Sequence, residues 1–318
     1  MLRTLEEITT MIKGNKLLHI SGTQDQLSKL PSGNWIGGSS AFFSTEFAAG
    51  NSSDKLCVFE LDFEKFRFQS YDKKSIASIT EDAFENGFTI VIMPAETEIL
   101  QEFAQNSSNY KDIFLKNVVG WIAGTNNSGK PIVINGQNAE PLTDNAVAMH
   151  VELPDDKRAL VSVVNIFTAD EQSPVIEFDK EGFFSKDFIV DGKKECIVDY
   201  AAAHNIDLQL PFVGEYSGSE INTSIVAFGE DKMLTFGAPL FQGIQYRFAK
   251  PLDNYAKAFI SKITDIPNKE CVFSCNCISN MYHGDLQKYD LGGFYGPYVY
   301  GEIAYQLVNQ TLVYLQIY

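Results

Sequence analysis

Two continuous apolar runs constrain the fold of this chain most. Residues 88–93 read FTIVIM and residues 118–123 read VVGWIA. Runs of this kind form strands that are buried on both faces, as in parallel or mixed sheets that helices cover. Pro94 ends the first run, and residues 96–105 between the two runs are predicted to form a helix. We therefore expect a mixed α/β fold.

Strands and helices alternate along the rest of the chain. Helices are also predicted at residues 2–12, 24–30, 75–86, 196–203 and 254–263. Further strands are predicted at residues 16–20, 34–36, 55–61, 66–71, 131–134, 145–151, 160–167, 187–191, 208–213, 221–228, 232–236, 244–248, 271–276 and 311–317. Because residues 169–186 are acidic and turn-like, we expect two packed subdomains, residues 1–186 and 187–318, each with mixed β-sheets flanked by helices.

Charge and composition exclude several classes of partner. The chain has 25 Lys and Arg against 41 Asp and Glu, a net charge of −16 at pH 7. Such a surface repels phosphate backbones and anionic lipid, so we expect neither a nucleic-acid nor a membrane partner. Residues 1–16 lack the apolar core of a signal peptide. The five cysteines are an odd number and are scattered, which disfavours a disulfide scaffold and indicates a cytoplasmic protein.

Three cysteines form the only dense group of residues that could bind a metal. Cys271, Cys275 and Cys277 would point the same way on a strand. Their spacing lacks a second zinc knuckle, so a core strand is the favoured interpretation. A metal or haem site with His283 is one alternative. A hydrolase with a Cys275 or Cys277 nucleophile, His283 as base and Glu302 as orienting group is another.

Two other ionisable residues have structural interpretations. His150 lies near the end of an otherwise apolar strand, where a hydrogen-bonded core histidine is favoured over a ligand or a base. Glu302 follows a glycine and begins a helix-like stretch at residues 302–308, and the helix dipole stabilises a carboxylate at a helix start.

Glycine-rich segments near both ends of the chain are candidate pocket walls. Gly37, Gly38, Ser39 and Ser40 follow a strand and could present N–H groups and hydroxyls to an anion. They lack the lysine of a P-loop and the spacing of a dinucleotide site, so a structural turn is the first interpretation. Near the other end, residues 292–305 hold five aromatic side chains between glycines and a proline, which bend the backbone sharply.

The glycine- and serine-containing loop of residues 214–220 and an arginine complete the predicted site. Arg247 lies in an apolar strand, where its guanidinium could bind a carboxylate ligand or pair with an acidic side chain. We expect one cleft to gather the polar and aromatic groups that a small-molecule pocket needs. Its predicted ligand-binding residues are Gly37, Gly38, Ser39, Ser40, Tyr216, Ser219, Arg247, Tyr295, Tyr300 and Glu302.

The chain resembles the FIST domain, a bacterial sensory module. The resemblance is carried by Asp191-Gly192-Lys193, Phe273-Ser274-Cys275, Gly293-Phe294-Tyr295, Tyr300-Gly301-Glu302-Ile303 and Asn309-Gln310-Thr311-Leu312, with Trp35-Ile36-Gly37-Gly38-Ser39-Ser40 matching the first half. It implies a two-part sensory domain that binds an amino acid or a similar metabolite. Some relatives are haem-dependent nitric oxide sensors. No output domain is attached here, so a signalling protein would act in trans.

The favoured hypothesis is a cytoplasmic, non-catalytic protein that binds a small ligand without a cofactor. One alternative is a haem-binding nitric oxide sensor with His204 or His283 as axial ligand. The other is the Cys–His hydrolase.

Overall fold

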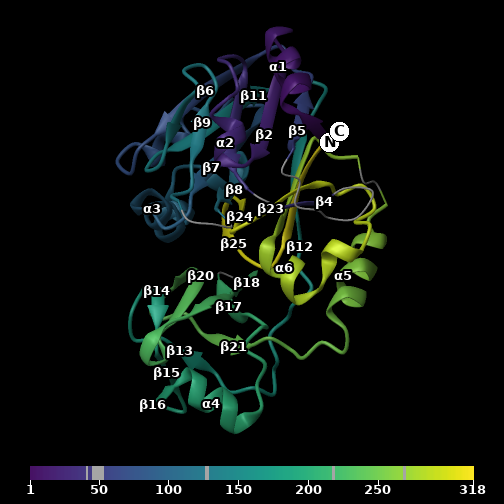
Figure 1. The fold of residues 1–318 in the computed structure, drawn as a ribbon. Coiled ribbons are helices and arrows are strands. Elements are labelled where there is room, and N and C mark those ends of the chain that lie inside the picture. The colour runs from purple at the N-terminus through teal and green to yellow at the C-terminus, as the bar shows by residue number, and fades with distance from the viewer. Residues whose placement is uncertain (41, 45–53, 126–128, 217–218, 268–269) are drawn as a thin grey trace.

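The computed structural model describes residues 1–40, 42–44, 54–125, 129–216, 219–267 and 270–318. Within these ranges the chain is a mixed α/β protein with five sheets, as predicted (Figure 1). Two parts can be distinguished. We call residues 165–253 the inserted module and the rest of the chain the frame. The module lies between strand β12 (Ala159–Val164) and helix α5 (Tyr255–Thr264) in the sequence.

The frame contains three sheets with the same arrangement at their centres. Each holds two parallel strands joined through a helix, and an antiparallel strand flanks each member of the pair. The three units are β2 (Leu17–Gly22), α2 (Gln24–Leu27) and β3 (Trp35–Ser39); β7 (Gly87–Pro94), α3 (Glu98–Asn106) and β8 (Asn117–Ala123); and β22 (Phe273–Cys277), α6 (Ile278–His283) and β23 (Gly296–Val299). The apolar runs at β7 and β8 thus form the predicted buried strands.

The three units exchange strands in a closed cycle. After each parallel pair, the next strand in the sequence pairs with a strand of a different unit, in a different sheet. Thus β4 (Phe42–Ser44) pairs with β23, β9 (Val133–Asn135) with β3, and β24 (Glu302–Ala304) with β8. One apolar core is shared by all three sheets, with Ile36, Trp121 and Cys275 among its members. The three sheets of the frame therefore enclose a single apolar core.

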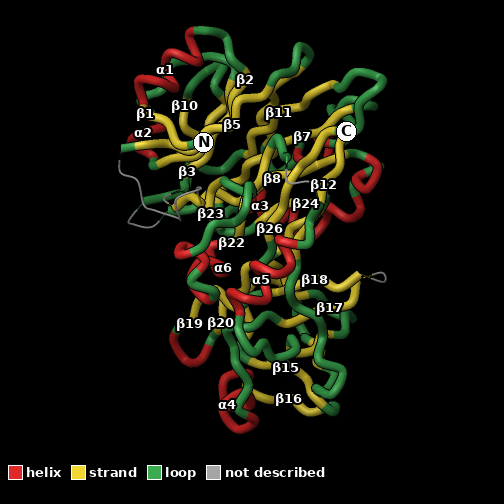
Figure 2. Tube along the Cα trace, turned by 90° about the vertical axis from the view of Figure 1, so that its right-hand side faces the viewer, coloured by secondary structure: helices red, strands yellow, loops and turns green. Residues whose placement is uncertain are grey.

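The remaining frame elements extend these sheets and cover them. Helix α1 (Leu5–Lys13) begins with a capping box between Thr4 and Glu7, as its sequence predicts. The outer strands are β1 (Leu2–Thr4), β5 (Lys55–Leu61), β6 (Phe66–Tyr71), β10 (Glu140–Leu142), β11 (Ala146–Glu152), β25 (Gln306–Val308) and β26 (Leu312–Ile317). Figure 2 shows α1 at the opposite end of the molecule from the module's helix α4 (Ile197–His204).

The inserted module has two antiparallel sheets and its own aromatic core. Phe178, Phe188, Phe212 and Phe236 are buried at its centre. Its strands are β13 (Ile176–Glu177), β14 (Gly182–Ser185), β15 (Asp187–Val190), β16 (Lys193–Cys196), β17 (Phe212–Tyr216), β18 (Ser219–Thr223), β19 (Ile225–Phe228), β20 (Leu234–Leu240) and β21 (Tyr246–Phe248). Helices α5 and α6 of the frame lie where the two parts meet (Figure 1).

The division into frame and module differs from the expected boundary. Residue 186 lies inside the module, between β14 and β15, and strands from both sides of it share sheets. In particular, β24 and β26 near the end of the chain pair with β8 and β12. Residues 169–186, whose acidic, turn-like composition predicted a boundary, instead belong to the module and contain β13, β14 and the buried Phe178.

Two predicted helices are wrong. Residues 302–308 form the hairpin of β24 and β25, and Tyr305 at its turn has a φ of 66°. Both strands join the β8 sheet, so pairing with neighbours outweighs the helical spacing of the apolar residues. Residues 75–86 contain a single 3-10 turn, Ile76–Ile79. No helix in the described ranges combines the length and the apolar character needed to cross a bilayer.

Candidate functional site

A cleft of about 470 Å³ lies between the inserted module and the frame. The module side of the cleft comes from the end of α4, the loop of residues 205–211 that follows it, and parts of residues 170–174 and 248–252. Helices α5 and α6 contribute the frame side through Tyr255 and His283. Its volume falls in the range of roughly 300–1,000 Å³ that is typical of small-molecule sites. Aromatic and ionisable side chains line it: Tyr200, His204, Asp207, Phe248, Tyr255 and His283.

The module side of the cleft is an ordered aromatic and polar wall. Helix α4 ends at His204, and Asn205 takes a left-handed conformation with φ of 54°, which turns the chain into the loop. The rings of Tyr200 and His204 stack with their centroids 4.1 Å apart. Phe248 lies nearly parallel to Tyr200 at 6.3 Å. These contacts hold the ring of His204 at the cleft although its side chain is exposed.

His283 of the frame and Asp207 of the module both line the cleft, and the charge of Asp207 acts on the imidazole of His283. Burial lowers the pKa of His283, and the carboxylate of Asp207 partly opposes this shift. No described residue hydrogen-bonds the imidazole of His283. Its nitrogens are therefore available to a ligand.

The floor of the cleft joins a buried polar network through Tyr255. Its hydroxyl donates to Oδ1 of Asn280 over 2.5 Å and accepts from Nε2 of Gln310 over 3.2 Å. The same amide of Gln310 donates to the carbonyl of Gln209 on the module side over 3.1 Å, and its Oε1 accepts from the hydroxyl of Ser224 over 2.6 Å. Gln310, which is buried and has a φ of 49°, thus connects the cleft floor to both parts of the molecule.

A second set of amides ties the module to the frame. Asn222 and Asn165 exchange side-chain hydrogen bonds of 3.1 and 3.0 Å. Asn222 also donates to the carbonyl of Asn309 over 3.1 Å, and Asn309 donates to the carbonyl of Gly237 over 3.1 Å. Hydrogen-bonded amides of this kind fix the geometry of a junction, because each buried polar group lost from the set is costly.

Glu302 is fully buried close to this network. Its Oε2 accepts from the hydroxyl of Thr311, the neighbour of Gln310, over 2.8 Å. Its Oε1 is buried without a hydrogen-bond partner among the described residues, and the neighbouring Cys277 offers only a weak S–H donor. Burial raises the pKa of Glu302 to about 8. The residue lies in β24 opposite Trp121, so the predicted position at a helix start is wrong.

The cysteines of β22 are core residues, as the favoured interpretation had it. Cys275 and Cys277 are buried, and Cys275 Sγ donates to the carbonyl of Gly120 over 3.6 Å. Burial and the nearby Glu302 raise the pKa of both thiols. A nucleophilic cysteine needs a thiolate and access to substrate, and this geometry supplies neither. His150 is likewise a satisfied core residue, with Tyr71 Oη 2.9 Å from its Nε2 and Thr89 Oγ1 2.8 Å from its Nδ1.

The structure brings the two predicted glycine-rich segments together and packs them tightly. The hydroxyl of Ser40 donates to the carbonyl of Tyr298 over 2.7 Å, and Ser39 Oγ accepts from the backbone of Ile132 over 3.0 Å. Gly37, Gly38 and Ser39 belong to β3. A Cβ on Gly38 would lie 2.7 Å from Ile92 Cγ2 and 2.9 Å from the Trp121 ring. The predicted structural turn is therefore wrong for Gly37 and Gly38, which are strand residues and leave no space for a ligand.

The other predicted site residues fall into two groups, one in the frame and one in the module. Tyr300 donates to the carbonyl of Thr125 over 2.5 Å, and Tyr295 donates to Asp290 Oδ1 over 2.9 Å. Arg247 is in the module, where it donates to the carbonyl of Ser173 and lines a hollow of about 290 Å³ with Glu215 and Glu220. Tyr216 and Ser219 pair at the tip of β17 and β18, and their side chains lie outside the described residues. The ten predicted residues are thus divided between frame and module.

Several residues of the site carried no clear signal in the sequence. Tyr255 and Gln310 were not selected, although Gln310 belongs to the Asn-Gln-Thr set of the FIST resemblance. His204, considered as a haem ligand, and His283, considered as a metal or haem ligand or as a base, line the same cleft. His19 was also missed: it is buried, its Nε2 accepts from Trp121 Nε1 over 2.7 Å, and burial lowers its pKa to about 3. No metal-binding group of three His, Cys, Asp or Glu occurs within the described ranges.

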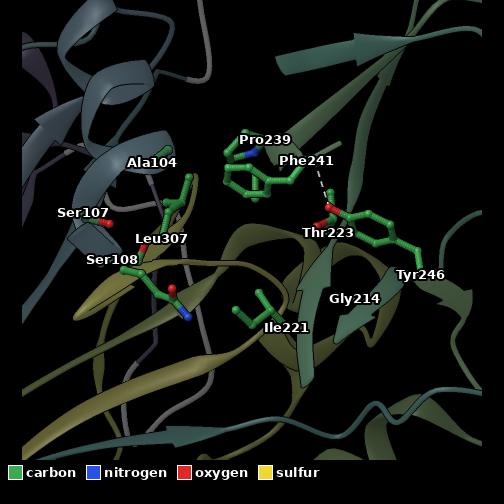
Figure 3. A pocket seen from close by; sticks show the side chains of 12 residues that line it. Ala104, Ser107, Ser108, Gly214, Ile221, Thr223, Pro239, Phe241, Tyr246 and Leu307 are labelled. Carbon is green, nitrogen blue, oxygen red and sulfur yellow. Dashed lines mark hydrogen bonds between the residues drawn. The ribbon is translucent and has the colours of Figure 1, made fainter. Parts of the chain in front are cut away.

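A second, smaller cavity lies between module and frame. Figure 3 shows Ser107, Ser108 and Leu307 of the frame facing Pro239 and Phe241 of the module. Its volume of about 30 Å³ is close to that of one water molecule. This cavity is too small for a metabolite, so the cleft is the candidate site.

The comparisons with known proteins assign no activity. A family described as "Family of unknown function (DUF6976)" matches residues 3–318. Neither a curated protein nor a solved structure matches the chain.

Proposed function

We propose that this chain, which belongs to the DUF6976 family, binds a small polar metabolite in the cleft between module and frame and does so without catalysis. The observation that carries the proposal is the junction itself. A cleft of metabolite size lies where two parts of the molecule meet, and its floor at Tyr255 is hydrogen-bonded through Gln310 to both of them.

The lining of the cleft supports ligand binding. Tyr200, Phe248 and Tyr255 provide apolar surface, while Asp207 and His283 provide polar groups that could fix the orientation of a ligand. Small-molecule sites combine these two kinds of surface. Among the described lining residues, the hydroxyl of Ser173 donates to the backbone carbonyl of Asp170 and not to an imidazole.

A sensory role is part of the same proposal. The resemblance to the FIST domain implies an amino acid or a similar metabolite as ligand and a signalling protein in trans as output. A ligand that contacts both sides of the cleft would stabilise one position of the module relative to the frame, and a partner could read that change. The charge and the cysteine content agree with a cytoplasmic location.

A thermal-shift screen of amino acids and other small metabolites tests the proposal. A ligand at 100 times its dissociation constant should stabilise the protein by about 2.7 kcal/mol. Gln209→Trp places a large ring in the cleft at an exposed side chain and keeps the backbone carbonyl that Gln310 uses. Gln137→Trp, at an exposed turn of the frame, is the matched control.

The expected result is a shift that persists in Gln137→Trp and disappears in Gln209→Trp. A shift that survives Gln209→Trp would contradict binding in the cleft. A broad library without any shift would count against ligand binding altogether.

Haem binding is a second candidate, because His204 and His283 line one cleft. Burial lowers the pKa of His283, so its imidazole is neutral near pH 7. Neutral imidazole is the form that binds iron. Either residue would supply an axial ligand. Protein purified with haem supplied should then show a Soret band that His283→Ala or His204→Ala alters. Absence of the band would exclude this candidate.

A further inference from the structure

We propose that the ligand of the cleft is an organic cation, whose positively charged amine binds to Asp207 and Asp170 beside the aromatic wall of Tyr200, Phe248 and Tyr255. The inference rests on the proposed function and names the chemical class of its ligand.

The charged groups of the cleft are all acidic or imidazole. Asp170 and Asp207 line it, and the described lining residues include neither Lys nor Arg. Each aspartate uses Oδ1 to accept one backbone N–H, from Gln172 over 3.0 Å and from Gln209 over 2.9 Å. No described residue donates to the second oxygen of either carboxylate. Two carboxylate oxygens therefore remain available to a donor on a ligand.

An anionic ligand would meet repulsion here. It would need Lys, Arg or a protonated imidazole to offset the two carboxylates and the −16 charge of the whole chain. Burial keeps the ring of His283 neutral near pH 7. A cation, in contrast, is attracted both by the aspartates and by the field of the chain.

The aromatic wall favours the same class. Tyr200, Phe248 and Tyr255 contribute three rings to one cleft, with Tyr200 and Phe248 inclined by 12°. Aromatic rings attract ammonium groups by about 0.5–2 kcal/mol, and they also bury the methylene or methyl groups that surround the charge. A neutral ligand would use the rings and leave the aspartates without a partner.

Matched probes separate these possibilities by calorimetric titration of the full chain. Butane-1,4-diamine, butane-1,4-diol and succinate share a four-carbon skeleton and differ in charge. Choline and its neutral isostere 3,3-dimethylbutan-1-ol form a second pair. We expect at least one cation to bind about tenfold or more tighter than its neutral counterpart, with no binding of succinate. Because exposed charges are screened, binding should weaken as the salt concentration rises.

Substitutions place the cation at the aspartates. Asp207→Asn should weaken cation binding by about tenfold, whereas Asp156→Asn, at an exposed aspartate outside the cleft lining, should change it by less than about twofold. Asp207 is exposed, so its variant should fold, and its melting temperature without ligand checks this. Equal losses in both variants would indicate only the general field of the chain and would overturn the inference.

The outcomes for the two proposals are distinct. Diol or succinate binding as tightly as the diamine, or a neutral or anionic compound from the screen whose binding Gln209→Trp removes, would overturn the cation inference and leave the proposed function in place. If none of the probes binds, a cation from the screen that both Gln209→Trp and Asp207→Asn weaken would support the inference. A screen without any ligand would contradict both proposals.

Discussion

Two regions of this molecule are rich in aromatic and polar residues, and only one of them is open. Where β3 meets the end of β23, Gly38 packs against Ile92 and Trp121, and Ser40 is hydrogen-bonded to the backbone of Tyr298. At the ends of α4 and α6, similar residue types surround a cleft of about 470 Å³. The difference lies in connectivity. Cyclic strand exchange draws the frame segments into one core, whereas an insertion meets the frame along a surface and leaves a cleft.

The largest loss of stability is expected when side-chain volume is added where β3 packs against Ile92 and Trp121. Gly38→Val should destabilise the protein by about 4 kcal/mol or more, because even the first added carbon would collide with Ile92 and Trp121. Chemical denaturation measures this loss. A cost below about 1 kcal/mol would show that the β3 region can yield, and the contrast between the two regions would fail.

The buried carboxyl group of Glu302 should make the folded state less stable as the pH rises through the neutral range. The pKa of Glu302 is about 8 in the folded chain and near 4.5 when unfolded, so the unfolded chain releases this proton first as pH rises. The contribution of Glu302 to the free energy of unfolding should therefore fall between pH 4.5 and 8, on the order of 4 kcal/mol. The buried His19 and His150, with pKa values lowered to about 3 and about 4, contribute an opposite rise up to pH 6.5, so the decline is measured as the difference between the wild type and Glu302→Gln. Glu302→Gln should remove this decline, and Glu181→Gln, at an exposed glutamate, should keep it. Equal profiles for both variants would contradict a raised pKa of the Glu302 carboxyl group.

The hydrogen bonds at the cleft floor should contribute a smaller amount. Tyr255→Phe removes the hydroxyl that joins Asn280 to Gln310 and should cost about 1–2 kcal/mol in the free energy of unfolding. Tyr289→Phe, at an exposed tyrosine, should cost less than about 0.5 kcal/mol. If both variants cost the same small amount, the floor of the cleft would not be tied to the network.

The smallest effect on stability is expected inside the cleft. Gln209→Trp should change the free energy of unfolding by less than about 0.5 kcal/mol, since the side chain is exposed and the backbone contact to Gln310 is kept. Added side-chain volume is thus expected to be tolerated at Gln209 and not at Gly38. A loss of several kcal/mol in Gln209→Trp would show that the cleft is as closed as the frame.

Sequence patterns predicted the elements that depend on residues close to one another in the sequence. The continuous apolar runs of β7 and β8 and the capping box of α1 formed as expected. The hairpin at residues 302–308 was missed, because its first strand pairs with β8, in which the partner of Glu302 is Trp121. Such pairing overrides a helical spacing of apolar residues.

The candidate site was predicted only in part, for a related reason. Glycine and serine residues with aromatic neighbours can form either a packed junction or a pocket wall, so the composition of residues 37–40 could not separate the two. The cleft depends on how the inserted module lies against α5 and α6. The types of the residues alone do not reveal that arrangement. His204 and His283 could be selected as chemically capable residues, but their common cleft could not.

Hydrogen exchange with the strongest ligand from the screen tests the central claim most directly. Ligand-dependent protection should appear in peptides that cover residues 200–211 and 278–284, on the two sides of the cleft, and should be absent from peptides that cover residues 35–40 and 295–302. Protection at residues 35–40 and 295–302 without protection at the cleft would contradict the assignment and return the site to the closed junction of the frame.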